Sequence, residues 1–186
     1  MASQIDICNR ALIRLGADTI TSMEDNTKEA RLLNIVYDQA RQELLRLHPW
    51  NFAIKRVILA SDPDAAPDFG FLYALPLPAD CIRVIDVDNE VTDYKIESGY
   101  MMCDSDVPEV IYIADIEDTS LFDSLFGTIL SLRLSSEVAY NLTNNASLAA
   151  QLTDEYIRMK REAKLFDGQE GTPGQFTNGT WLDSRW

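Results

Sequence analysis

Few side chains in this sequence could support catalysis or hold a metal. His48 is the single histidine, so a Ser-His-Asp or Cys-His set has one candidate base, and no motif offers it a nucleophile. Cys8, Cys81 and Cys103 are scattered among apolar or strand-like neighbours, which favours reduced packing side chains over a disulfide or a zinc site. We therefore expect a protein that is not an enzyme and has no cofactor.

A calcium-loop pattern is present in part. Acidic side chains occupy its first, third, fifth and twelfth positions, namely Asp86, Asp88, Glu90 and Glu97. The position where the loop needs glycine for its sharp turn is Val91. Because the same stretch also has the pattern of two short strands, we interpret the acidic spacing as a coincidence.

The net charge of −14 is concentrated in the middle of the chain. Residues 1–60 carry 8 basic and 7 acidic side chains, residues 61–123 carry 2 and 16, and residues 124–186 carry 6 and 7. Since phosphate binding needs clustered Lys and Arg, the middle segment is not a nucleic-acid-binding surface. It is either a solubilising face or a channel lining that repels sliding DNA.

Length and composition favour a globular protein. With 186 residues, 46% of them hydrophobic, the chain can bury the core of one domain, or of one domain with an insertion. It has no run of 18 apolar residues, and its first residues lack the pattern of a secretory signal. We expect a protein made in the cytoplasm, without a membrane-spanning segment.

The residues from 26 to 60 combine a long amphipathic helix, an aromatic turn and a strand. Apolar residues recur at helical spacing and predict a helix over about residues 27–47, with Asn26 as its N-cap and Pro49 beyond its end. Three large apolar residues fall off the apolar stripe of this helix and indicate a second packing partner, either another helix or a neighbouring subunit: Leu32, Ile35 and Leu45.

The turn after this helix carries large aromatic side chains. Trp50 and Phe52 follow Pro49 and can pin the chain where it changes direction. We interpret Pro49, Trp50 and Phe52 as a hinge between a helical and a β domain. A ligand-stacking site is the alternative.

The order of these segments resembles a known protein family. It comprises the helix, the sequence R-x-x-L-L-x-x-x-P-W-N-F-A from Arg41, a strand with Lys55 and Arg56, and L-P-x-D-C-I-R-V-I-D-V at residues 77–87. This pattern is similar to the head-to-tail adaptor proteins of short-tailed bacteriophages, the tail tubular protein A group. The resemblance extends along most of the chain.

The resemblance implies a structural protein in the neck of the virion. Adaptors of this kind form a homo-oligomeric ring, dodecameric in known relatives, between the portal protein and a tail nozzle of the tail tubular protein B type. DNA passes through the ring without sequence-specific binding. In this family a C-terminal extension reaches towards the portal or an adjacent subunit.

The last twenty residues are polar and rich in glycine, yet they retain aromatic side chains. Such a segment cannot fold alone and is typically ordered by a partner. We predict that it docks on the portal or on a neighbouring subunit through Phe176, Trp181, Leu182, Arg185 and Trp186. The alternative is a frayed end whose tryptophans fold back on their own subunit.

Three further helices and several strands complete the expected elements. Helical periodicity predicts helices over about residues 4–15, 121–142 and 146–166. Four or five short strands are expected from about residue 53 to residue 116.

We therefore predict an α+β fold, mainly α, with three parts. Residues 1–50 and 118–166 form a four-helix bundle, residues 51–117 an inserted small acidic antiparallel β domain, and residues 167–186 an extended C-terminal arm. The main alternative to an adaptor is a free-standing helical protein-interaction or regulatory module. A third possibility is a small hydrolase that uses paired carboxylates.

Overall fold

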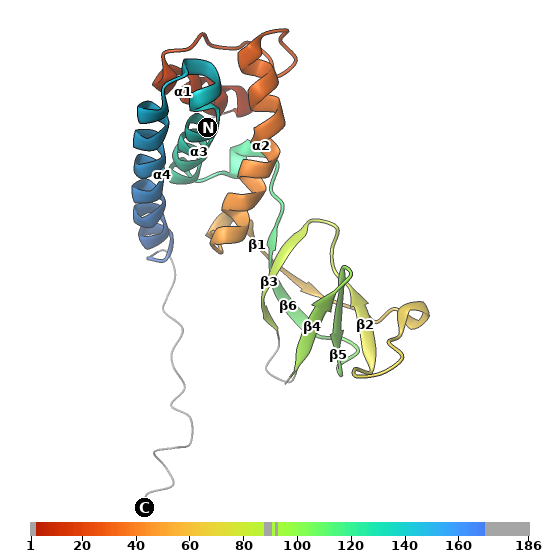
Figure 1. Ribbon diagram of the computed structural model, residues 1–186. Coiled ribbons are helices and arrows are strands. Elements are labelled where there is room, and N and C mark those ends of the chain that lie inside the picture. The colour runs from red at the N-terminus through yellow and green to blue at the C-terminus, as the bar shows by residue number, and fades with distance from the viewer. Residues whose placement is uncertain (1–2, 88–90, 92, 170–186) are drawn as a thin grey trace, which may run out of the picture.

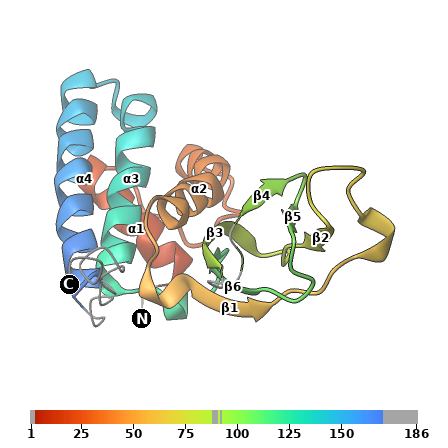
Figure 2. The same cartoon turned by 90° about the horizontal axis from the view of Figure 1, so that it is seen from below.

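The computed structural model describes residues 3–87, 91 and 93–169 (Figure 1). Within these residues the fold is α+β, with four α-helices and two three-stranded antiparallel sheets. The helices are α1 (Gln4–Leu15), α2 (Lys28–Leu47), α3 (Ser124–Thr143) and α4 (Ala146–Asp167). They lie together on one side of the molecule and the sheets lie on the other (Figure 2).

The predicted four-helix bundle is wrong. α3 is a central helix that packs against α1, α2 and α4, whereas these outer helices approach one another closely at few places. α1 packs on α3 and not along α2. An amphipathic pattern shows that a helix buries one stripe but does not identify the element that covers it, so four such patterns do not define a bundle.

Local side chains determine where the first two helices begin and end. Ser3 caps α1 and forms a capping box with Asp6, and Gly16 ends the helix with a left-handed φ of 67°. Thr27, and not the predicted Asn26, caps α2, because its hydroxyl accepts a hydrogen bond from the Ala30 N–H at 3.2 Å.

The third helix begins later than predicted. Asp118 caps a separate short 3₁₀ turn, Thr119–Leu121, by accepting a hydrogen bond from the Ser120 N–H at 2.8 Å. Asp123 then caps α3 itself, which starts at Ser124. Two consecutive Asp caps therefore divide a stretch that sequence periodicity treats as one helix.

All strands in the described residues lie between Ile54 and Ala114. The first sheet has the order β1-β6-β3, formed by β1 (Ile54–Ile58), β6 (Glu109–Ala114) and β3 (Cys81–Val87). The second has the order β2-β5-β4, formed by β2 (Tyr73–Pro76), β5 (Tyr100–Cys103) and β4 (Tyr94–Glu97). β2 is an edge strand and therefore tolerates Pro76, which cannot donate to a ladder.

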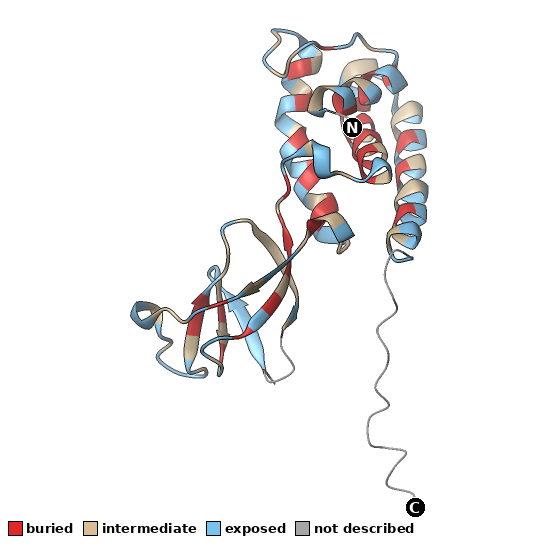
Figure 3. Cartoon of the chain, turned by 180° about the vertical axis from the view of Figure 1, so that it is seen from behind, coloured by how far each residue is buried: buried red, intermediate tan, exposed pale blue. Residues whose placement is uncertain are grey.

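Two hydrophobic cores stabilise the molecule. The larger one surrounds α3 and extends to the inner end of the first sheet, where Ile113 and Ala114 are fully buried. The smaller one lies between the two sheets and contains Leu59, Leu75, Met101, Cys103 and Val110. Figure 3 shows the buried positions of the helices facing the middle of the helical group.

Candidate functional site

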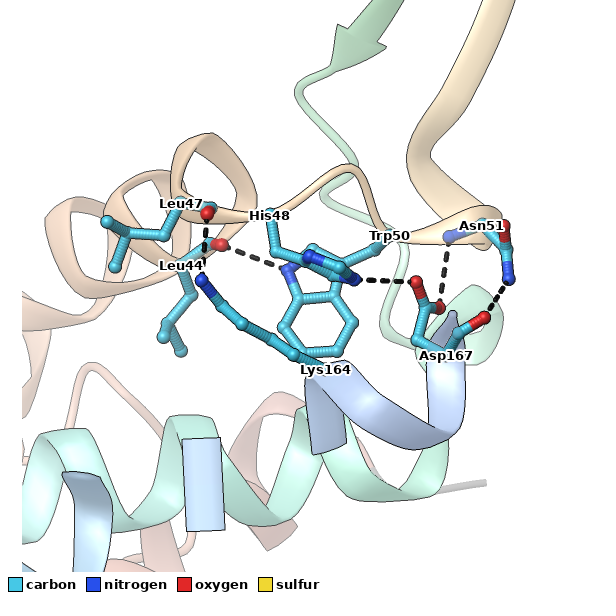
Figure 4. A network of polar contacts seen from close by, with 7 residues as sticks. All are labelled: Leu44, Leu47, His48, Trp50, Asn51, Lys164 and Asp167. Carbon is cyan, nitrogen blue, oxygen red and sulfur yellow. Dashed lines mark hydrogen bonds and ion pairs between the residues drawn. The ribbon is translucent and has the colours of Figure 1, made fainter. Parts of the chain in front are cut away.

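The corner between α2 and β1 binds the end of α4 (Figure 4). The Asp167 carboxylate accepts a hydrogen bond from the Asn51 N–H at 3.1 Å and lies 2.8 Å from Nε2 of His48. The Asn51 side-chain amide donates to the Asp167 carbonyl at 2.8 Å. We call these three residues, together with Lys164, the α4 clamp.

Lys164 completes the clamp from the preceding turn of α4. Its Nζ donates to the Leu47 carbonyl at 3.0 Å, where a cation is favoured by the dipole of α2. Burial lowers the pKa of Lys164, and the neighbouring cations Lys160 and Arg83 lower it further. The last turn of α4 is therefore joined to the end of α2 through both side-chain and backbone groups.

An aromatic cluster lies beside the clamp. Trp50 is 1% exposed, its Nε1 donates to the Leu44 carbonyl at 2.9 Å, and its ring meets Phe126 edge to face at 5.3 Å between centroids. Phe52 contacts the same Phe126 ring at 5.0 Å. Because Trp50 is enclosed by its own chain, its ring is not a ligand-stacking surface. The three residues predicted to form a hinge lie between α2 and β1, namely Pro49, Trp50 and Phe52.

A second set of polar contacts joins α2 to the sheets. Arg41 is 2% exposed; it pairs with Asp115, just after β6, and donates to the Ile116 carbonyl at 2.9 Å. Arg46 donates to the Ile82 carbonyl in β3 at 2.6 Å. Sequence reasoning missed Arg41. The signal was available, since Arg41 lies at the edge of the apolar stripe, one turn from both Tyr37 and Leu44, where a buried arginine needs an acidic partner.

Within the described residues, the candidate catalytic and metal-binding side chains are not grouped together. No Ser, Thr or Cys side chain among them bonds to His48, so the His48–Asp167 pair has no nucleophile beside it. The part of the chain that the structure describes also holds no group of three acidic, His or Cys side chains placed for a metal. Burial raises the pKa of the Cys8 thiol to about 12, which makes it unreactive at neutral pH.

Two members of the calcium-loop pattern can be located. Asp86 lies in β3 and Glu97 in β4, which belong to different sheets. Asp88 and Glu90 lie outside the described residues. The two-strand interpretation of this stretch therefore agrees with the structure.

The three residues predicted for subunit packing have different environments. Leu45 is fully buried in the larger core of its own chain, so we withdraw it from the predicted inter-subunit surface. Leu32 is half-buried against that core, and Ile35 is 75% exposed. Of the three, Ile35 alone has most of its side chain exposed.

The predicted docking residues Phe176, Trp181, Leu182, Arg185 and Trp186 lie outside the described residues. The structure nevertheless describes the point from which their segment continues, because α4 ends at Asp167 in the clamp. Leu165 and Phe166 in the last turn of α4 are exposed and add apolar surface at this point.

Comparison of the chain with known protein families and with curated proteins finds no match. None of the described helices is both long enough and apolar enough to cross a membrane.

We expect replacement of Asp167 by alanine to loosen the end of α4. The change removes the acceptor of the Asn51 N–H and the partner of His48, so the free energy of unfolding should fall by about 1–3 kcal/mol. Amide hydrogen exchange should accelerate in the last turn of α4 more than elsewhere. Asp154→Ala, at an exposed position of the same helix, is the matched control, and equal exchange in the two variants would contradict the clamp.

Proposed function

We propose that this protein is a head-to-tail adaptor of a short-tailed bacteriophage. In this proposal it is a non-catalytic structural part of the virion neck. Copies of the chain form a homo-oligomeric ring, with a dodecamer as the expected size, between the portal protein and the tail nozzle. DNA passes through the ring without sequence-specific binding.

The observation that carries the proposal is the fixed end of α4. An arm with aromatic anchors docks efficiently only if its origin has a defined position, because freedom at the origin adds to the entropy lost on binding. Asp167 and Lys164 attach that origin to the corner where the helices meet the first sheet. The segment that follows carries two tryptophans, a phenylalanine and an arginine, which are typical interface anchors.

The coupling between helices and sheets also supports a mechanical role. α2 packs on α3 along one side, and its second half contacts β3 and β6. The buried Arg41 fixes this contact by donating to the Ile116 carbonyl just after β6. Trp50 holds the corner after α2 by donating to the Leu44 carbonyl. A subunit built in this way can transmit force between its two ends without a change in their relative position.

Deletion of residues 171–186 tests the proposal directly. The full-length chain mixed with its cognate portal protein should form closed rings on the portal, visible by electron microscopy. The truncated chain should keep its fold but bind the portal at least about 100-fold more weakly. The loss of two aromatic hot spots of roughly 2 kcal/mol each raises the Kd by more than that factor.

Point variants separate the anchors from the length of the arm. Trp181→Ala with Trp186→Ala should reproduce most of the loss, whereas Thr177→Ala with Thr180→Ala in the same segment should not. Unchanged portal binding by the truncated chain would refute the docking arm. Portal binding by isolated monomers or dimers without a ring would instead favour the free-standing interaction module.

A further inference from the structure

Two loops at one end of the second sheet carry exposed apolar side chains and exposed carboxylates. One loop lies before β2 and the other after β5, and they meet where the Leu72 N–H donates to Asp104 at 3.0 Å. Their exposed apolar residues are Phe69, Leu72 and Val107, and their exposed acidic residues are Asp64, Asp68, Asp104 and Asp106. We call these seven residues the acidic tip.

The acidic tip has no internal partner in the described residues. Phe69 is 88% exposed, and burial of such a large apolar side chain against a partner is favourable. No Lys or Arg in the described part of the chain lies within ion-pair distance of the tip carboxylates. Clustered exposed apolar side chains mark interaction sites, and the four carboxylates favour a basic partner.

A groove of matching character lies between α1 and α3. It has a volume of about 280 Å³ and is lined by Arg10, Ile13 and Arg14 of α1 and by Thr128 and Ser131 of α3. Ile13 is largely exposed and lines the same groove as the two arginines. Arg14 pairs with Glu155 at 3.0 Å, whereas Arg10 makes no ion pair with any described residue. We call this site the basic groove.

The acidic tip and the basic groove cannot meet within one molecule. The tip lies at the far end of the sheets and α1 lies in the helical group, so they are at opposite ends of the subunit in two perpendicular views (Figures 1 and 2). The apolar side chains and the opposite charges therefore match only between two copies. A contact between different surfaces of identical subunits is heterologous and closes into a ring when the rotation fits.

We propose that the acidic tip of one subunit docks in the basic groove of the next. Phe69 packs against Ile13, and the carboxylate of Asp68 faces Arg10. The inference rests on the proposed ring and names the residues that join its subunits. Tip-to-tip pairing is disfavoured by repulsion among the carboxylates, so the subunits join in one direction.

Charge exchange between two variants tests this contact. Asp68→Arg places a cation on the tip, and Arg10→Glu places a carboxylate in the groove; both positions are exposed. Each variant alone sets like charges against each other and should assemble on the cognate portal about 10- to 100-fold more weakly than the unchanged chain. In an equal mixture each tip again meets an opposite charge in the neighbouring groove, so alternating rings should recover.

The outcomes separate this inference from the proposed function. Sedimentation and electron microscopy measure assembly, circular dichroism verifies folding, and binding of single subunits to the portal reports the arm independently. The tip-groove contact is overturned if the two variants are folded but their mixture assembles no better than each alone. It is also overturned if either single variant assembles as well as the unchanged chain. Phe69→Ser, which keeps all charges, must also weaken assembly. If the unchanged chain forms no ring on its portal, the proposed function and this inference both fail.

Discussion

Replacement of Trp50 by alanine is expected to lower the free energy of unfolding by about 3–5 kcal/mol, the range for buried aromatic truncations. The indole fills the space beside Phe52 and Phe126, and its Nε1 supplies the hydrogen bond to the Leu44 carbonyl. The variant would leave a cavity at the corner and a buried carbonyl without its donor. Urea denaturation monitored by circular dichroism measures the change in the free energy of unfolding.

One further variant separates the hydrogen bond of Trp50 from its ring, and another serves as an exposed aromatic control. Trp50→Phe keeps an aromatic ring but no donor, so it should cost roughly 1–2 kcal/mol. Phe69→Ala removes an aromatic side chain that is almost fully exposed, and the change should stay within about 0.5 kcal/mol. A loss for Phe69→Ala as large as that for Trp50→Ala would mean that the corner is not the stabilising element we infer.

The helices and most strands could be predicted because their signals are local. Ser3 and Gly16 delimit α1 at the predicted residues. Asn144 ends α3, and Asn145 directly after it caps α4. The β4–β5 hairpin turns at Ser98 and Gly99, whose positive φ values of 50° and 83° suit a two-residue turn. Each of these features depends on neighbours within a few residues, which the sequence displays directly.

The arrangement of the helices was harder to predict, although part of the signal was present. The apolar residues of α3 surround the helix, a pattern typical of a helix with several neighbours, and this agrees with its central position. The count of four helices suggested a bundle of equivalent members, and that inference was wrong. A periodic pattern gives the width of a buried face but not the identity of the element that covers it.

Leu45 and Ile35 show the same limit within one helix. Both lie off the apolar stripe of α2, yet Leu45 is buried and Ile35 is exposed. The second half of α2 lies against both α3 and the first sheet, which widens its buried face, while no such second cover lies over Ile35. The sequence does not reveal which half of a helix has two neighbours.

The clamp and the acidic tip depend on contacts between distant residues. Asp167 and Asn51 are 116 positions apart, and no local pattern relates them. The tip consists of irregular loops without periodicity, so its apolar side chains give no structural signal until the loops are brought together. These contacts follow from topology, which sequence reasoning described only in outline.

Replacement of Arg41 by methionine should destabilise the protein by about 2–4 kcal/mol. Removing one partner of a buried ion pair typically costs roughly 3–5 kcal/mol, and this value is reduced here because the Asp115 side chain is 20% exposed. The variant keeps an unbranched apolar side chain in the core but leaves Asp115 and the Ile116 carbonyl without the guanidinium. Thermal and urea unfolding measure the loss.

A double-mutant cycle separates the ion pair from simple packing. If the cost of Arg41→Met comes from the uncompensated carboxylate, then adding Asp115→Leu should recover a large part of it, because an apolar pair can replace a buried ion pair. Arg31→Met, at an exposed position of the same helix, should change stability by less than about 1 kcal/mol. Strictly additive losses for Arg41→Met and Asp115→Leu would show that the two side chains stabilise the junction independently, and α2 would then be held to the sheets by packing alone.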